Sequence, residues 1–225
     1  MIYDKDNLQM AVIQKLAALE DRNVLEIGCG DGSLSVRLAV ETRRYIAMDP
    51  DKEAIASARQ LSGSAAFLMG KGENLPCADA SFDLVIFILS LHHQNSGRAL
   101  MEADRVLNSS GRLIILEPAA DGEFQQFFHL FDDETDALTS AARAIAHSQF
   151  DLIRHKVFAV PAEFEDLSEL CQYPFGQDPA DETAPTRILA KLQQFQGGIK
   201  EGQRIKLFDT IHIYSLVKRQ IDRKF

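Results

Sequence analysis

A predicted strand that runs directly into three alternating glycines is the feature of this sequence that most constrains its fold. The strand covers residues Asn23–Ile27, and it is followed by Gly28, Gly30 and Gly32 and then by a segment with helical spacing. Glycine permits positive φ angles and lets another group approach the backbone closely. At the carboxyl end of the first strand of a parallel sheet, a turn of this kind predicts a crevice that holds a ligand.

Short apolar runs alternate with segments of helical spacing along the first half of the chain. Strands are predicted at residues 23–27, 44–48, 65–69, 82–89 and 112–116, and helices at 33–40, 51–61 and 97–107. This alternation predicts an α/β fold with a doubly wound parallel sheet that carries helices on both faces.

The second half of the chain has a less regular pattern. Strands are predicted at residues 152–160 and 205–217, helices at 123–131, 132–147, 164–170 and 186–195, and a proline-rich loop at 174–185. Gly197 and Gly198 are expected to end the last helix. No change of composition resembles a linker, so residues 1–225 are expected to form a single domain with insertions at the ends of its sheet.

The composition excludes several classes of protein. The chain has 24 basic and 33 acidic residues among 225, and its net charge of -9 disfavours broad binding to nucleic acid. The longest apolar run, Leu84–Leu89, is far shorter than the roughly 20 residues of a membrane span, and the acidic N-terminus differs from a signal peptide. Three scattered cysteines, Cys29, Cys77 and Cys171, favour free thiols, and a cytoplasmic protein is expected.

An acid that follows the glycines narrows the choice of ligand. Asp49 closes the second predicted strand about 20 residues after the glycines, where a carboxylate accepts hydrogen bonds from ribose hydroxyls. Ser33 stands where a dinucleotide fingerprint has its third glycine, and no Lys-Ser/Thr pair marks a phosphate loop. Glu26 would repel pyrophosphate but suit a cation. The pattern favours a nucleoside with a cationic tail over a turn that only packs strand on helix.

These segments resemble the class I S-adenosylmethionine-dependent methyltransferases. Residues Glu26–Gly32 look like the glycine motif of that family, and Ala47–Pro50 resembles its ribose acid. Further matches in order are residues 70–76 for the adenine loop, 81–85 for the fourth strand, and 102–107 with 111–113 for the next helix and strand. The combination is similar to the UbiE-like, or methyltransferase type 11, branch and covers about residues 20–118.

The resemblance implies a fold and a first set of site residues. It implies a Rossmann-like sheet of seven strands, mainly parallel, whose last strand is antiparallel. Gly28, Cys29 and Gly30 would face the methionine part of the cofactor, with Glu26 near its amino group. Asp49 would take the ribose hydroxyls.

The resemblance also implies residues around the adenine. Pro50 would lie against the ring, Gly72 and Glu73 would border its edge, and Ile88 would contact the cofactor after the fourth strand. Lys71 departs from the family, which commonly has an acid at that position, and lysine cannot accept a hydrogen bond. Either Glu73 substitutes for that acid, or backbone and packing alone hold the adenine.

Three residues are candidates for proton transfer. His92 and His93 follow the strongest predicted strand, where acceptor and cofactor should meet, and imidazole accepts protons near neutral pH. Glu117 ends the next strand at the same edge. The competing interpretations are that the histidines only pack or line the cofactor pocket, and that Glu117 is a solvated acid or helix partner. No metal site is expected.

The predicted function is methyl transfer from S-adenosylmethionine to a small-molecule acceptor. Residues 20–118 would form the cofactor-binding core, and residues 119–204 the acceptor-side insertions. Within the latter, four phenylalanines between Phe124 and Phe131 have helical spacing and would form either core or a lid over the acceptor. The alternatives are a protein or RNA methyltransferase, an S-adenosylmethionine-binding protein that transfers no methyl group, and a dinucleotide oxidoreductase.

Overall fold

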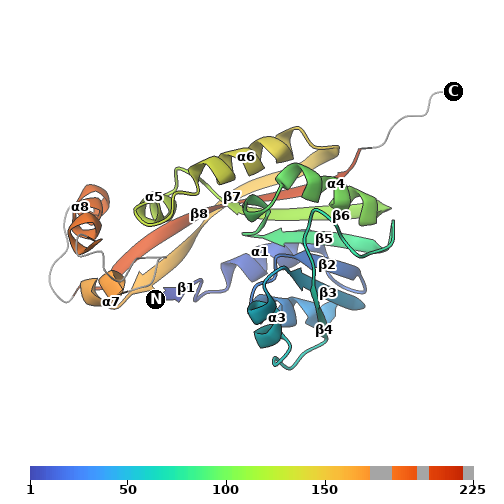
Figure 1. The fold of residues 1–225 in the computed structure, drawn as a ribbon, viewed down its shortest axis with the longest axis horizontal. Helices are drawn as coiled ribbons and strands as arrows, with labels where there is room; N and C mark the ends of the chain where they lie inside the picture. The colour runs from blue at the N-terminus through green and yellow to red at the C-terminus, as the bar shows by residue number, and fades with distance from the viewer. Residues whose placement is uncertain (173–183, 197–202, 220–225) are drawn as a thin grey trace. The chain divides into compact units, whose positions relative to one another are not determined.

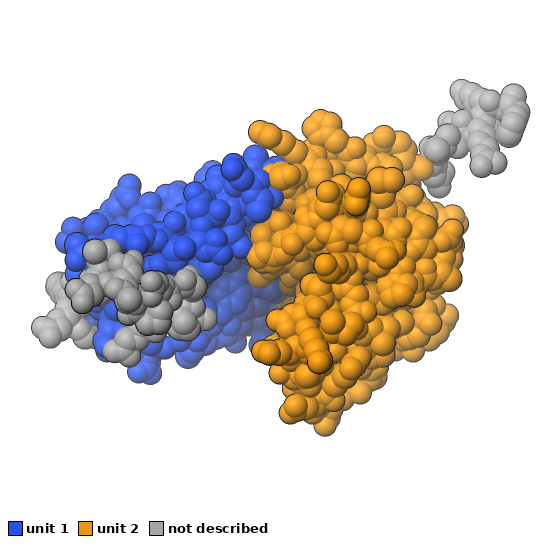
Figure 2. All heavy atoms as spheres, in the orientation of Figure 1, with its two compact units in different colours: residues 1–9, 118–139, 157–211 blue, residues 10–117, 140–156, 212–225 orange. Residues whose placement is uncertain are grey.

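The computed structural model describes residues 1–172, 184–196 and 203–219, which divide into two compact units (Figure 2). Unit 1 comprises residues 1–9, 118–139 and 157–211, and unit 2 comprises residues 10–117, 140–156 and 212–225. The predicted cofactor-binding core lies in unit 2 up to residue 117. The predicted acceptor-side stretch contributes to both units, because residues 140–156 belong to unit 2.

The strands form a mixed sheet in the order β1-β7-β8-β6-β5-β2-β3-β4 (Figure 1). Their bounds are β1 Ile2–Tyr3, β2 Asn23–Ile27, β3 Arg44–Asp49, β4 Ala65–Met69, β5 Phe82–Ile88, β6 Leu107–Pro118, β7 Phe150–Phe164 and β8 Ile205–Lys218. The ladders that join β4, β3, β2, β5 and β6 are all parallel. The predicted doubly wound, mainly parallel sheet is therefore confirmed.

Helices separate successive strands, except between β4 and β5, and two of them follow β6 and two follow β7. They are α1 Leu8–Ala17, α2 Ser33–Leu38, α3 Lys52–Ala58, α4 Ser96–Val106, α5 Glu123–Phe128, α6 Thr135–Ala146, α7 Leu167–Gln172 and α8 Ala184–Gln196, with 3₁₀ turns η1 at Ala39–Glu41 and η2 at Leu91–His93. No helix in the described part of the chain has the length and apolar character to cross a membrane.

The sheet has eight strands, so the predicted count of seven is wrong. The additional strand is β1, which pairs antiparallel with β7 through residues 2 and 3. A strand of two residues carries no periodic signal, which is why the pattern of the sequence does not reveal it. The last strand, β8, runs antiparallel to β7. The evidence is a hydrogen bond that joins the end of β8 to the start of β7, in which the N–H of Arg219 just after β8 donates to the carbonyl of Gln149 just before β7.

Several predicted boundaries move. The helix expected at 164–170 begins at Leu167, since β7 continues to Phe164, and β6 begins at Leu107 where a helix end was expected. Leu107 pairs with Phe82 across a register irregularity, so the strand starts before the apolar run that predicted it. Of the loop predicted at 174–185, residues 174–183 lie outside the part of the chain that the structure describes. Gly197 and Gly198 also lie outside it.

Each unit has its own apolar core. In unit 2, the strands β2, β5 and β6 pack with α4 and α6, for example through Leu25, Val85 and Leu100. In unit 1, Phe124 and Phe127 of α5 are buried in a cluster that also draws on α8, β7 and β8. These two phenylalanines are core residues of unit 1, which is the commoner role of aromatic side chains at helical spacing.

Candidate cofactor site

The glycine loop after β2 has the positive φ angles that its sequence predicts. Gly28 and Gly30 have φ angles of +79° and +53°, values that side chains other than glycine rarely adopt. A Cβ on Gly28 would lie only 2.3 Å from the Cβ of Ser90, whereas a Cβ on Gly30 would meet no heavy atom within 4 Å. Gly28 is therefore required by both backbone and packing, and Gly30 leaves open space above the loop.

Asp49 holds this loop against the end of β3. Its Oδ2 accepts the N–H of Gly30 at 2.9 Å, and its Oδ1 accepts the N–H of Asp51 at 2.8 Å. The N–H groups of Gly28 and Cys29 both donate to the carbonyl of Met48. A carboxylate can accept about four hydrogen bonds, so Asp49 keeps capacity for the hydroxyls of a ligand.

A cavity of about 560 Å³ opens at the carboxyl ends of β2, β3 and β5. Its size is in the range of small-molecule sites. The lining includes residues 28–30 of the glycine loop, residues 49–50 after β3, residues 72–73 of the following loop, and Ile88. Every residue predicted to bind the cofactor thus lines one space, with the exception of Glu26.

Glu26 lies buried beneath the loop, with a side chain that takes no part in the cavity lining. Its Oε2 accepts hydrogen bonds from the hydroxyls of Ser35 and Tyr45 at 2.5 and 2.9 Å. Burial raises the pKa of this carboxyl to about 7, against the lowering effect of the two hydrogen bonds. At neutral pH, the charge of the Glu26 carboxyl therefore depends on which charged groups lie nearby.

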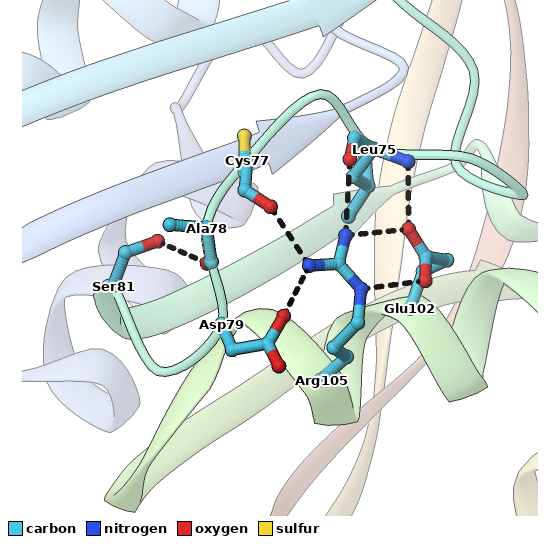
Figure 3. Close-up of polar contacts among 7 residues, drawn as sticks. All are labelled: Leu75, Cys77, Ala78, Asp79, Ser81, Glu102 and Arg105. Carbon is cyan, nitrogen blue, oxygen red and sulfur yellow. Dashed lines mark hydrogen bonds and ion pairs between the residues drawn. The ribbon is translucent and has the colours of Figure 1, made fainter.

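The wall of the cavity is anchored by Arg105 of α4 (Figure 3). The guanidinium donates to the carbonyls of Leu75 and Cys77 and to the carboxylates of Asp79 and Glu102, at 2.7–3.0 Å. Glu102 in turn accepts the N–H of Leu75 at 2.7 Å. This network ties down the chain that follows residues 70–73, so the cavity wall is fixed by a residue outside the cavity.

The same wall contains a residue that the sequence did not single out. Gln94 lines the cavity, and its Oε1 lies so close to Gly72 that a Cβ on Gly72 would be 2.0 Å away. Glu73, the predicted substitute for the missing acid, accepts the N–H of Asn95 through Oε1 at 2.8 Å. Lys71 is exposed at the rim of the cavity. A single glutamine just after η2 belongs to no sequence pattern that marks a ligand contact, so the role of Gln94 was found only from the structure.

The three candidates for proton transfer meet at η2. Glu117 and His92 are buried, with 2.5 Å between Oε2 and Nδ1, and Oε1 of Glu117 accepts the N–H of Leu91 at 2.8 Å. The ring centroids of His92 and His93 are 3.9 Å apart. Only His93 of the three lines the cavity, so the structure separates one exposed imidazole from a buried histidine-carboxylate pair.

The sheet order, the glycine loop and the acid at the end of β3 are the features expected of a class I methyltransferase domain. Residues 25–115 match the family model described as a methyltransferase domain, a stretch that runs from β2 into β6. Residues 25–115 therefore match the methyltransferase domain family, and the resemblance that the sequence suggested is confirmed.

Curated relatives match about half of the chain. A Mycobacterium tuberculosis protein named "Probable S-adenosylmethionine-dependent methyltransferase" is 36% identical over 109 residues, which are 48% of this chain and 40% of the relative. Norajmaline N-methyltransferase from Rauvolfia serpentina is 31% identical over 120 residues, 50% of this chain and 41% of the relative. The matches thus span about two fifths of the length of these relatives.

The solved structures extend the likeness of fold to nearly the whole chain. The YcgJ protein of Bacillus subtilis superposes with a TM-score of 0.73 at 21% identity, over 96% of this chain and 100% of that protein. The shared fold therefore includes the second half of the chain, where the family model does not match.

Proposed function

We propose that the protein transfers the methyl group of S-adenosylmethionine to a small-molecule acceptor. The observation that carries this proposal is that the positive-φ glycines and the carboxylate of Asp49 border one cavity at the strand ends. When bound, the cofactor supplies a methyl group already activated by a sulfonium. The relative named for N-methylation of norajmaline supports an acceptor of the small-molecule class.

The cavity suits the parts of this cofactor. In our proposal, the backbone of residues 28–30 borders the methionine part, and Asp49 accepts the ribose hydroxyls with its remaining lone pairs. Glu26 acts from beneath the loop, because an ionised carboxylate there favours a cationic ligand. Pro50 and Ile88 supply apolar surface to the bound nucleoside.

The wall formed by residues 72–73 borders the adenine edge. Gly72 leaves room for the amide of Gln94, since any side chain at position 72 would collide with that amide. Glu73 accepts the N–H of Asn95, the residue that caps α4, and so holds this wall in place.

Proton transfer is assigned to η2. His93 lines the cavity and is placed to take a proton from an acceptor hydroxyl or amine. Glu117 is a positioning residue that orients His92, against whose ring His93 packs. The buried pair thus limits the orientations of His93, as a buried carboxylate does for a catalytic imidazole in general.

Acceptor recognition is assigned to residues 119–204. This stretch follows the matched methyltransferase domain, and we propose that both belong to a single methyltransferase domain.

The free thiols of Cys29, Cys77 and Cys171 favour a reducing compartment, and we place the protein in the cytoplasm.

The test is a methyl-transfer assay with labelled S-adenosylmethionine against a panel of small hydroxyl, amine, thiol and carboxyl compounds. Release of S-adenosylhomocysteine that depends on one acceptor and falls in His93→Ala supports the proposal. Cofactor binding with no turnover on that panel, on proteins or on RNA would show a binding protein, and turnover only on a macromolecule would refute the small-molecule acceptor.

A further inference from the structure

We propose that Gln94 is a specificity-determining residue, whose side-chain oxygen accepts a hydrogen bond from the 6-amino group of the bound purine. The proposal deepens the function proposed above and rests on it. It answers the question raised by Lys71, a residue that can only donate at the position where the family commonly has an accepting acid.

The orientation of the Gln94 amide is fixed by its own neighbours. Nε2 donates to the carbonyl of Ser90 at 3.1 Å. A carbonyl has no hydrogen to give, so the amide nitrogen must face Ser90 and the amide oxygen must point away from it. Oε1 accordingly points at Gly72 in the cavity wall, 2.0 Å from where a Cβ of residue 72 would stand.

The oxygen is available to a ligand. Among the described residues no group donates a hydrogen bond to Oε1 of Gln94, and the residue lines the cavity. The side chain is half-buried, so it is held in place and still in contact with the cavity space. A ligand amine that reached this oxygen would meet an acceptor whose orientation is already set, which reduces the entropy lost on binding.

The neighbouring polar side chains already hold parts of the fold. Oε1 of Glu73 holds the N–H of Asn95, and the hydroxyl of Ser90 donates to the carbonyl of Ile27 at 2.6 Å. Asp49 lies at the end of β3 and holds the glycine loop. Gln94 differs from them in that its amide oxygen has its orientation set by the bond of its own Nε2 to Ser90.

This arrangement selects the chemistry at position 6 of the purine. A 6-amino group donates to Oε1, whereas a 6-oxo group would place two oxygens against each other. Turning the amide over would avoid that contact, but it would place the two oxygens of Gln94 and Ser90 face to face. The site is therefore expected to discriminate an amine from both a hydrogen and an oxygen at this position.

The experiment compares two ligands by isothermal titration. One is S-adenosylhomocysteine, and the other is its purine riboside analogue, in which a hydrogen replaces the 6-amino group and nothing else changes. The proteins are the wild type, Gln94→Met, which keeps the length of the side chain but has no amide, and Glu73→Ala, which removes the competing acceptor. The quantity measured is the ratio of the two Kd values for each protein.

The wild type should bind S-adenosylhomocysteine about tenfold tighter than the analogue, the usual effect of one hydrogen bond. In Gln94→Met the ratio should fall to about one through weaker binding of S-adenosylhomocysteine, with the affinity for the analogue retained as proof of an intact site. Glu73→Ala should keep the tenfold ratio. A ratio unchanged in Gln94→Met, or lost in Glu73→Ala instead, would overturn the inference and leave the proposed function standing. A wild type that binds neither ligand would overturn both.

Discussion

The carboxylate of Glu117 lies 2.5 Å from Nδ1 of His92, and both side chains are buried. The second oxygen of Glu117 accepts the N–H of Leu91, so one carboxylate fixes both the backbone of η2 and the ring of its second residue. His93 packs on that ring and faces the cavity. A side chain near the end of β6 therefore sets the geometry of a histidine of η2, the turn that follows the neighbouring strand β5.

Replacement of Glu117 should impair turnover more than cofactor binding. We expect Glu117→Gln to lower kcat by about tenfold to a hundredfold, within the range that general base catalysis supplies, with little change in Kd for S-adenosylhomocysteine. The substitution also removes a negative charge that favours the protonated form of the neighbouring imidazole. The ascending limb of the pH–rate profile should therefore move to lower pH. Glu117→Asp should recover part of kcat. An unmoved pH profile would show a purely structural role.

Gly28 and Gly30 of the glycine loop should respond differently to replacement by alanine. Both positions have positive φ, which costs roughly 1–2 kcal/mol for a residue with a Cβ. Gly28→Ala adds a collision with Ser90, whereas Gly30→Ala places its methyl group in open space. Urea denaturation should therefore show a clearly larger loss of stability for Gly28→Ala than for Gly30→Ala. Equal losses would mean that the loop shifts freely and does not shape the cavity.

The buried Glu26 should make the protein less stable as pH rises. Burial raises the pKa of its carboxyl from the ordinary 4.5 to about 7 in the folded state. Between these values the folded protein holds a proton that the unfolded chain has lost, so this contribution to stability is full below about pH 4.5 and disappears as pH rises through about 7.

Glu26→Gln removes this titration and keeps a side chain of the same shape. Urea denaturation at pH 5 and pH 8 should show a decline of up to about 3 kcal/mol in the wild type that is reduced in Glu26→Gln. The same decline in both proteins would contradict a raised pKa at this position.

Arg105 should not tolerate replacement by lysine. The guanidinium bonds two carbonyls and two carboxylates at once, a fork that an ammonium cannot reproduce. We expect Arg105→Lys to reduce the free energy of unfolding by about 1–3 kcal/mol. Arg43→Lys is the matched control, since Arg43 pairs with Asp21 on an exposed surface and should cost at most about 1 kcal/mol. A loss at Arg105 no larger than at Arg43 would show that the cavity wall is held by other contacts.

The parallel part of the fold is predictable because its signals are local. Residues Asn23–Ile27 form a strand with the bounds that their apolar run predicts, since a strand buried on both faces has a nearly continuous apolar sequence. β1 has two residues and pairs with a strand about 160 positions away in sequence, which no local pattern records.

The site shows the same division between features with a local sequence signal and features set by long-range contacts. Gly28 and Asp49 are recognisable because their spacing reflects backbone geometry, and both line the cavity. Gln94 and Arg105 act through distant partners, and Glu26 lies behind the loop that its position in the motif suggested it would line. Contacts that depend on which side chains meet across elements are set by tertiary packing, and a single sequence does not specify them.

Isothermal titration of S-adenosylhomocysteine into the wild type and Asp49→Ala tests the central claim most directly. The account predicts one binding site per chain in the wild type and a loss of at least about tenfold in affinity in Asp49→Ala, since the ribose hydroxyls lose a charged acceptor. No binding to the wild type, or the same affinity in both proteins, would contradict it.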